Sequence, residues 1–438
     1  MRLSTSFSGR IIERGKPGFD EARGMFNSSI DCYPTAVLYC RSETDVQLAL
    51  QAARNIGRQV AVRSTGHSVS GRSIADDVIV IDLSEMRDVI PLNDGIFACQ
   101  GGTTWAKFDA ATSRRGWAVT GGTVSSTGVG GLTLGGGIGW LLPSAGLACD
   151  SLIGACVVMA DGEKRYVSDA DDPEFMRCLR GLGHGLAVLT QLHFAARPLL
   201  ALVAGSLTVD LNRLSDMLVD QLCRLMTNPP QSLMLSPSFI YRESRPVMSI
   251  DLAMHDPSPS DLDQVNQLAR HRAVLKNTVG TRSYELLQSM LDNPARAGLR
   301  ARWIPRYLNF IEPGIILQLI EIFRDAPSRE NIIFLEHYHG VYGAPLRPSA
   351  FPSRDARFSL LAIANWSNAA DDSANHQWLL EIDRKINRWA SPREPYLNYV
   401  SRFSSRGLQD WLPTHLNVKR RVDPDGLFVN ALSPNVEN

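Results

Sequence analysis

Apolar residues in the first 200 positions follow two spacings, one typical of helices and one typical of strands. Between Ser42 and Gly57 they recur every three or four positions, which predicts an amphipathic helix. Ser42 or Thr44 can cap its start and Gly57 ends it. The same reasoning predicts helices at 105–115 and from Asp172-Pro173, and strands at 59–63, 78–81, 152–159 and 187–194.

The pattern changes after Arg197-Pro198. From there to about residue 394 glycine becomes rare, and strands alternate with longer amphipathic helices. We expect a hairpin from 239–242 and 247–253, strands at 331–340 and 358–366, and a helix at 371–389. The tail, 396–438, returns to a glycine-and-loop character. The pattern thus predicts an α+β protein in which residues 1–200 and 395–438 form one domain and residues 201–394 form another.

Composition excludes several classes of function. Lysine plus arginine and aspartate plus glutamate both number 45, so the net charge is zero, which argues against a nucleic-acid partner. The seven cysteines are irregularly spaced and form no CxxC pair, so neither a zinc site nor a disulfide framework is indicated. No apolar run approaches the ~18 residues of a membrane span, and the N-terminal segment lacks the apolar core of a signal peptide. We expect a cytoplasmic protein without a membrane partner.

Two glycine-rich stretches carry the chemistry, 61–83 around His67 and 120–140 (TGGTVSSTGVGGLTLGGGIGW). Glycine lets backbone amides approach an anionic ligand because no Cβ stands in the way. Neither stretch is a GxGxxG motif opening a helix or a GxxxxGK[ST] loop, so neither a Rossmann nor a P-loop nucleotide site is predicted.

The motifs Arg63-Ser-Thr-Gly-His67-Ser-x-x-Gly71, Ile-Asp82-Leu-Ser and Gly-Val-Gly130-Gly-Leu-Thr-Leu-Gly135-Gly-Gly-Ile-Gly139-Trp resemble those of the vanillyl-alcohol-oxidase type of FAD-linked oxidases. The nearest branch is the berberine-bridge-enzyme-like one, with its bacterial natural-product oxidases. The resemblance covers most of the first 200 residues and the last 40. It implies a two-lobed FAD-binding domain of the PCMH type, plus a substrate domain whose antiparallel sheet is covered by helices.

The resemblance also implies FAD as cofactor, bonded covalently from the His67 ring to the 8α-methyl group of the flavin. The alternative is a loop histidine satisfied by a backbone carbonyl. Some relatives add a cysteinyl bond, but this chain has Thr123 there, so at most one covalent bond is expected. The residues expected to bind the cofactor are Arg63, Ser64, Thr65, Gly66, His67, Ser68, Gly71, Gly122, Thr127, Gly128, Gly130, Gly131, Gly136, Gly137, Gly139, Trp140, Asp150, Val188 and Asn398.

The chain departs from the resembled pattern at three places. Thr65 replaces a glycine beside His67, the loop 183–187 reads Gly-His-Gly-Leu-Ala instead of Gly-Gly-Asn-Phe-Gly, and the pair 431–432 is Ala-Leu instead of Asn-Gln. The last two regions normally lie against the flavin. Their change leaves open an altered flavin environment or unusual chemistry.

Three residues are candidates for catalysis. Tyr399 matches a position where relatives often carry a tyrosine base, although an unperturbed phenol has a pKa near ~10; the alternative is a packed strand tyrosine. Glu336 and Tyr338 would share one face of a strand, with His337 and His339 on the other. That histidine pair has no evident third ligand, so no metal site is predicted.

We therefore expect an FAD-linked oxidase acting on an alcohol or activated C–H group of a secondary-metabolite intermediate, with hydride passing to flavin N5 and O2 as acceptor. The alternatives are a cyclase or rearrangement catalyst without net redox change, a carbohydrate oxidase and a flavin-free scaffold. The expected partners are a small-molecule substrate and O2, and the expected state is a monomer or homodimer.

Overall fold

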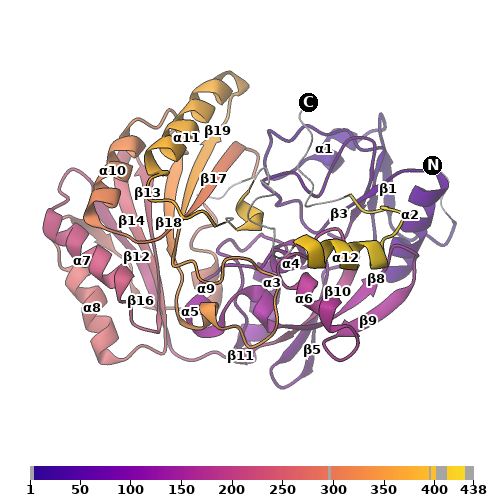
Figure 1. The fold of residues 1–438 in the computed structure, drawn as a ribbon, viewed down its shortest axis with the longest axis horizontal. Coiled ribbons are helices and arrows are strands. Elements are labelled where there is room, and N and C mark those ends of the chain that lie inside the picture. The colour runs from indigo at the N-terminus through magenta and orange to yellow at the C-terminus, as the bar shows by residue number, and fades with distance from the viewer. Residues whose placement is uncertain (1–3, 294–296, 394–395, 401–411, 430–438) are drawn as a thin grey trace.

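The computed structural model describes residues 4–293, 297–393, 396–400 and 412–429, and their strands form three main sheets (Figure 1). The first sheet has the order β1-β2-β4-β3. Its strands are β1 (Arg10–Glu13), β2 (Ala36–Tyr39), β3 (Val60–Arg63) and β4 (Ile79–Asp82). β2 and β3 both pair parallel with the fully buried β4. Since its side chains face other protein on both sides, the first three residues of β4 are all apolar.

The helix predicted after Ser42 is α2 (Glu43–Asn55). The Ser42 side chain accepts a hydrogen bond from the backbone N–H of Asp45, as an N-cap should. α2 packs on the first sheet through its apolar face. The short α1 (Phe19–Arg23) contacts β1 and β2.

The second sheet is entirely antiparallel, with the order β5-β6-β10-β8-β9. Its strands are β5 (Val89–Asn93), β6 (Ile96–Gln100), β8 (Leu152–Val158), β9 (Lys164–Ser168) and β10 (Val188–Ala195). Side chains of α3 (Trp105–Ser113) and α6 (Pro173–Leu179) join those of the sheet in one core. Both helices start as predicted, α6 being capped by Asp172. β7 (Trp117–Ala118) and β11 (Arg197–Pro198) pair separately.

The third sheet has eight strands and is antiparallel throughout, in the order β15-β12-β14-β13-β18-β19-β17 with β16 beside β12. Its strands are β12 (Leu202–Asp210), β13 (Leu233–Arg242), β14 (Arg245–His255), β15 (Val274–Asn277), β16 (Gly280–Thr281), β17 (Arg300–Leu308), β18 (Ile332–His337) and β19 (Phe358–Trp366). The hairpin β13–β14 and strand β19 confirm the predicted elements. The strand expected at 331–340 ends earlier, at His337.

Helices cover one face of this sheet, and the part of the protein that contains the first two sheets adjoins the other face (Figure 1). α7 (Asp216–Thr227), α8 (Pro259–Ala269), α10 (Pro313–Arg324) and α11 (Asp372–Ile386) build the outer layer. On the opposite face lie α5 (Leu142–Ala145) and α9 (Tyr284–Gln288). Alternate residues of each strand therefore face either the helices or the first two sheets.

Two helices arise where loops were predicted. α4 (Val129–Leu134) forms inside the second glycine-rich stretch, and α12 (Leu412–Val422) forms in the tail. α12 returns to the first half of the chain and packs on α6, where Arg421 pairs with Asp172. In both places tertiary contacts outweigh the weak local helix propensity. Among the described residues no helix is long and apolar enough to cross a membrane.

Candidate functional site

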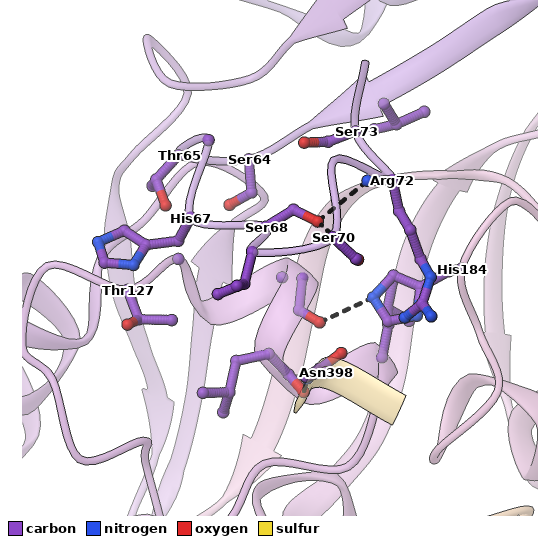
Figure 2. Close-up of a pocket in the computed structure, with 18 of the residues that line it drawn as sticks. Ser64, Thr65, His67, Ser68, Ser70, Arg72, Ser73, Thr127, His184 and Asn398 are labelled. Atoms are coloured by element: carbon purple, nitrogen blue, oxygen red, sulfur yellow. Dashed lines mark hydrogen bonds between the residues drawn. The ribbon is translucent and has the colours of Figure 1, made fainter. Parts of the chain in front are cut away.

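A deep cavity opens between the two glycine-rich stretches and holds about 1550 Å³ of open space, counting the part that opens to solvent. The loop after β3 forms one wall and α4 with the segment before it forms another (Figure 2). Asn398 and Tyr399 come in from the tail, and Trp303 from β17. Eleven of the predicted cofactor-binding residues line it: Ser64, Thr65, Gly66, His67, Ser68, Gly122, Thr127, Gly128, Gly130, Gly131 and Asn398.

Gly131 tests whether a bound ligand fits against α4. A Cβ placed on Gly131 would meet no protein atom within 4 Å, although the residue lies in the cavity wall. Its neighbours Gly128 and Gly130 instead lie close to Ser64 and to the Gly101 carbonyl, so a Cβ there would collide with protein. Two glycines thus permit close packing of the walls, and the third leaves an open face of backbone toward the cavity.

His67 stands at one end of the cavity and is held on two sides. Its Nε2 is hydrogen-bonded to Ser126 Oγ at 2.9 Å, and its ring stacks on Phe26 with centroids 4.3 Å apart. Burial lowers the pKa of His67 to about 4, with Asp292 acting in the opposite direction. The imidazole is therefore neutral at physiological pH and its other ring nitrogen, Nδ1, is left for another partner.

Arg72 and His184 lie together at the other end (Figure 2). Arg72 donates hydrogen bonds to the carbonyls of Leu397 and Val400, and burial lowers its pKa only to about 10, so it stays charged. His184 donates from Nε2 to the Gly131 carbonyl at 2.9 Å, and burial lowers its pKa to about 4. The cavity thus has a positive charge at the end opposite His67.

Glu336 links two tyrosines beneath the cavity. Tyr399 donates a hydrogen bond to its Oε1 at 2.9 Å and Tyr338 donates to its Oε2 at 2.6 Å. The carboxyl group is fully buried. Burial raises the pKa of Glu336 to about 7, and the hydrogen bonds from the tyrosines and Ser359 only partly offset that. The pKa of each tyrosine is raised well above its ordinary value by burial and then by the Glu336 charge.

The three catalytic candidates differ in their capacity to accept a proton. Tyr399 lines the cavity and its T-shaped contact with Trp303 closes the wall there. A phenol whose pKa is raised donates a hydrogen bond but does not remove a proton at neutral pH. Glu336, with a pKa near neutrality, is the group suited to accept one. Tyr399 moreover lies in a short 3₁₀ turn, 397–399, and not in a strand.

Several predicted cofactor contacts lie off the cavity wall. Arg63 forms a buried ion pair with Asp82, and Asp150 forms one with Arg354 at 2.6 Å. The remaining five, which pack against other protein, are Gly71, Gly136, Gly139, Trp140 and Val188. Gly137 supports the site indirectly, because its N–H donates to the Tyr396 hydroxyl at 3.0 Å. That hydroxyl also accepts from Asn398 at 2.7 Å.

Four residues of the site went unnoticed in the sequence, namely Phe26, Arg72, Ser126 and Trp303. Arg72 and Ser126 are within the two glycine-rich stretches, where any charged or hydroxyl side chain was a candidate. Phe26 and Trp303 come from segments with no glycine signal at all. The altered pair at 431–432 lies outside the described residues.

The two histidines of β18 and the segment after it lie against each other. The rings of His337 and His339 stack with centroids 4.6 Å apart. His339 donates to the Leu233 carbonyl, and no group of three or more His, Cys, Asp or Glu residues in the described part of the chain is arranged to hold a metal ion. All seven cysteines are free.

Comparison with known proteins identifies the fold and a cofactor-binding domain. Residues 34–168 match the family model of the FAD binding domain. The whole chain superposes on the crystal structure of 6-hydroxy-D-nicotine oxidase from Arthrobacter nicotinovorans with a TM-score of 0.88 at 22% identity, covering 100% of both chains. BBE-like 1 from Physcomitrella patens gives 0.84 at 17% identity, over 99% and 98% of the two chains. The fold is therefore the predicted PCMH-type FAD-binding fold.

Proteins of similar sequence match almost the whole length of the chain. The uncharacterized FAD-linked oxidoreductase YgaK of Bacillus subtilis is 24% identical over 97% of this chain and 96% of its own length. The (R)-6-hydroxynicotine oxidase of Paenarthrobacter nicotinovorans is 28% identical over the same shares, 97% and 96%. The chain is an enzyme, an FAD-linked oxidoreductase, as the glycine-rich motifs predicted.

Proposed function

We propose that the protein is an oxidase that removes a proton and a hydride from a small organic substrate bound between Trp303, Tyr399 and the cofactor cavity. The observation that carries this is Glu336, a buried carboxyl group with a pKa of about 7 directly behind the cavity wall. FAD bound in the cavity would accept the hydride and pass the electrons to O2.

Glu336 acts as the general base in this proposal. It takes up the proton of a substrate O–H or N–H, relayed by the hydroxyl of Tyr399, which lines the cavity and donates to Glu336. Tyr338 fixes the second carboxyl oxygen, so the carboxylate keeps one orientation. General base catalysis of this kind contributes ~10²- to 10⁴-fold.

The cavity beside Tyr399 favours a substrate with an apolar or aromatic body. Trp303 lines it, and Phe334, Leu361 and Ile363 pack next to Tyr399. These side chains offer few polar groups for a carbohydrate, so we place a secondary-metabolite alcohol or amine ahead of a sugar. The (R)-6-hydroxynicotine oxidase, a relative that this chain matches over almost its whole length, is named for such a molecule.

We further propose that FAD is bonded covalently to His67 and only there. Ser126 holds Nε2, which leaves Nδ1 for the 8α-methyl carbon. His67 would hold the flavin through this nitrogen: a C–N bond would replace one methyl C–H bond and the imidazole N–H bond, both protons would be released, and O2 would accept the two electrons. Thr123 stands in the cavity wall but has no thiol for a second bond.

The first experiment is an absorption spectrum of the purified protein before and after acid precipitation. Yellow colour that stays with the pellet in the wild type and is released from His67→Ala supports the covalent bond. Release of the colour from both proteins would contradict the covalent bond and would still support FAD as the cofactor.

In the second experiment the FAD-loaded protein is mixed, under anaerobic conditions, with a panel of cyclic amines, benzylic alcohols and sugars. Bleaching of the flavin by an amine or alcohol, lost in Glu336→Gln, supports the proposed oxidase. Conversion of a compound with an unchanged spectrum would indicate a cyclase or rearrangement catalyst instead, and bleaching by sugars alone would indicate a carbohydrate oxidase.

A further inference from the structure

A row of polar side chains crosses the third sheet on the face turned away from its four covering helices. Ser206 of β12 lies opposite Asp251 of β14, and Asp251 lies opposite Ser236 of β13. The neighbours of Asp251 in sequence, Ile250 and Leu252, point into the helix-covered core, so Asp251 points to the other face.

The same row continues to the proposed base. β13 pairs with β18 so that Ser238 lies opposite Phe334. Extended by two residues, this antiparallel register places Ser236 opposite Glu336. The hydrogen bond from His339 to the Leu233 carbonyl follows the same register. Ser236 therefore stands between two carboxyl groups whose strands are about 10 Å apart.

Hydrogen bonds join the outer half of this row. Asp251 Oδ1 accepts from the hydroxyls of Ser206 and Ser249. Asp251 itself is 3% exposed and Glu336 is 0% exposed, whereas Ser206 is only half-buried. Ser236, Asp251 and Ser206 thus form a row of polar side chains that leads from the buried Glu336 to the less buried Ser206.

Ser236 is the unusual member. Its hydroxyl is buried and has no hydrogen-bond partner among the described residues. Such a group lowers the stability of the fold, so its presence calls for an explanation. A serine hydroxyl both donates and accepts, and rotation about χ1 moves it between staggered positions in the space separating the two carboxyl groups.

We propose that Ser236 and Asp251 relay the proton of Glu336 across the sheet to Ser206 on β12. The carboxyl O–H of Glu336 gives its proton to Ser236 Oγ, and the original hydroxyl proton of Ser236 passes to the Asp251 carboxylate. Asp251 then loses a proton through Ser206 to water. This inference rests on the proposed role of Glu336 as base, and it assigns Ser236 and Asp251 as positioning residues that act through it.

The charges around the row agree with proton exchange. Burial raises the pKa of Asp251, while the Ser206 and Ser249 hydroxyls and the distant Arg242 act against that rise. Around Glu336 the facing groups are Tyr338, Tyr399 and Ser359. Both carboxyl groups therefore keep a proton to higher pH than exposed carboxyl groups would.

The first test needs no substrate. Carboxyl-¹³C NMR of the FAD-loaded protein follows Glu336 and Asp251 from pH 4 to 9 in wild type, Asp251→Asn and Ser238→Ala. Ser238 is the matched control because it is a buried serine on the same face of β13, two residues from Ser236. We expect each wild-type carboxyl signal to report the ionisation of the other, and the Glu336 midpoint to fall in Asp251→Asn only. Independent single-step titrations would overturn the coupling.

The second test uses a substrate from the panel above and compares Ser236→Ala, Ser236→Thr and Ser238→Ala. Single-turnover flavin bleaching requires Glu336 to accept only one proton. Repeated turnover requires Glu336 to lose that proton again in every cycle. We expect Ser236→Ala to keep the single-turnover rate and lose at least about tenfold in kcat, with recovery by added imidazole and in Ser236→Thr. If Glu336→Gln abolishes bleaching while Ser236→Ala behaves like Ser238→Ala, the relay is wrong and the base stands. If Glu336→Gln bleaches normally, the base is wrong, and the relay fails with it.

Discussion

The hydroxyl of Tyr399 donates a hydrogen bond of 2.9 Å to Oε1 of Glu336, joining two residues 63 positions apart. Tyr399 faces the cavity and Glu336 lies fully buried behind it. A buried carboxyl group is costly when charged. The two tyrosine hydroxyls reduce that cost, and a base poised near neutral pH results.

Replacing Tyr399 with phenylalanine should shift the pH dependence of catalysis. The Tyr399 hydroxyl stabilises the charged form of Glu336 and so lowers its pKa. Since the base is active when deprotonated, kcat/KM should rise with pH through about 7 in the wild type. In Tyr399→Phe that rise should move to higher pH and kcat should fall. The matched control is Tyr284→Phe, whose hydroxyl donates to the Val119 carbonyl instead; an equal shift in both variants would contradict the assignment.

Gly131→Ala should separate folding from cofactor binding. Alanine is the better helix former by ~1 kcal/mol, and its methyl would meet no protein atom within 4 Å. The variant should therefore keep or slightly raise the Tm of the apoprotein but bind FAD at least tenfold more weakly. Gly314→Ala, in α10 outside the cavity, should change Tm similarly and leave the FAD Kd unchanged. Both variants are measured in the His67→Ala background, which cannot form the covalent bond: titration of each apoprotein with FAD, followed by flavin fluorescence, gives the Kd, and thermal unfolding gives the Tm.

Asp109 should make the protein less stable as pH rises. Its carboxyl group is fully buried in α3, neither oxygen has a hydrogen-bond partner among the described residues, and burial raises its pKa well above the ordinary value. Below pH ~4 both folded and unfolded forms are protonated, and above it only the unfolded form ionises, which costs up to ~1.4 kcal/mol per pH unit. Asp109→Asn removes this dependence, so its Tm advantage should grow between pH 4 and 8. A constant difference between the two Tm curves would show that Asp109 ionises in the folded protein.

Local signals predicted the elements but not how distant segments meet. The cap at Ser42 and the apolar run of β19 are properties of a few adjacent residues, and α2 and β19 appear where expected. The glycine-rich stretches likewise marked the cavity, because glycine spacing reflects close approach of backbone. The pairing of Tyr399 with Glu336 depends on a sheet register and a returning tail, which no local pattern encodes. α4 and α12 were missed for the same reason, since their stability comes from packing.

Asp150 was expected at the cofactor from the family resemblance, and the structure places it in an ion pair. It accepts two hydrogen bonds from Arg354, which lies on the long connection between β18 and β19. Both side chains are largely buried, at 5% and 16% exposure. The pair holds that connection against the segment just before β8 of the second sheet. Removing one member leaves an uncompensated buried charge, so Arg354→Ala should cost ~3–5 kcal/mol in the free energy of unfolding.

The same connection offers its own control. Asp355 pairs with Arg393 at the surface, with exposures of 66% and 35%, and an exposed pair is worth only ~0–1 kcal/mol. Urea unfolding of Arg354→Ala and Asp355→Ala should therefore differ by several kcal/mol, while FAD affinity, measured under native conditions, stays near that of the wild type in both. Weaker FAD binding in Arg354→Ala without loss of stability would instead return Asp150 to the cofactor site, because only a direct contact would then explain the effect.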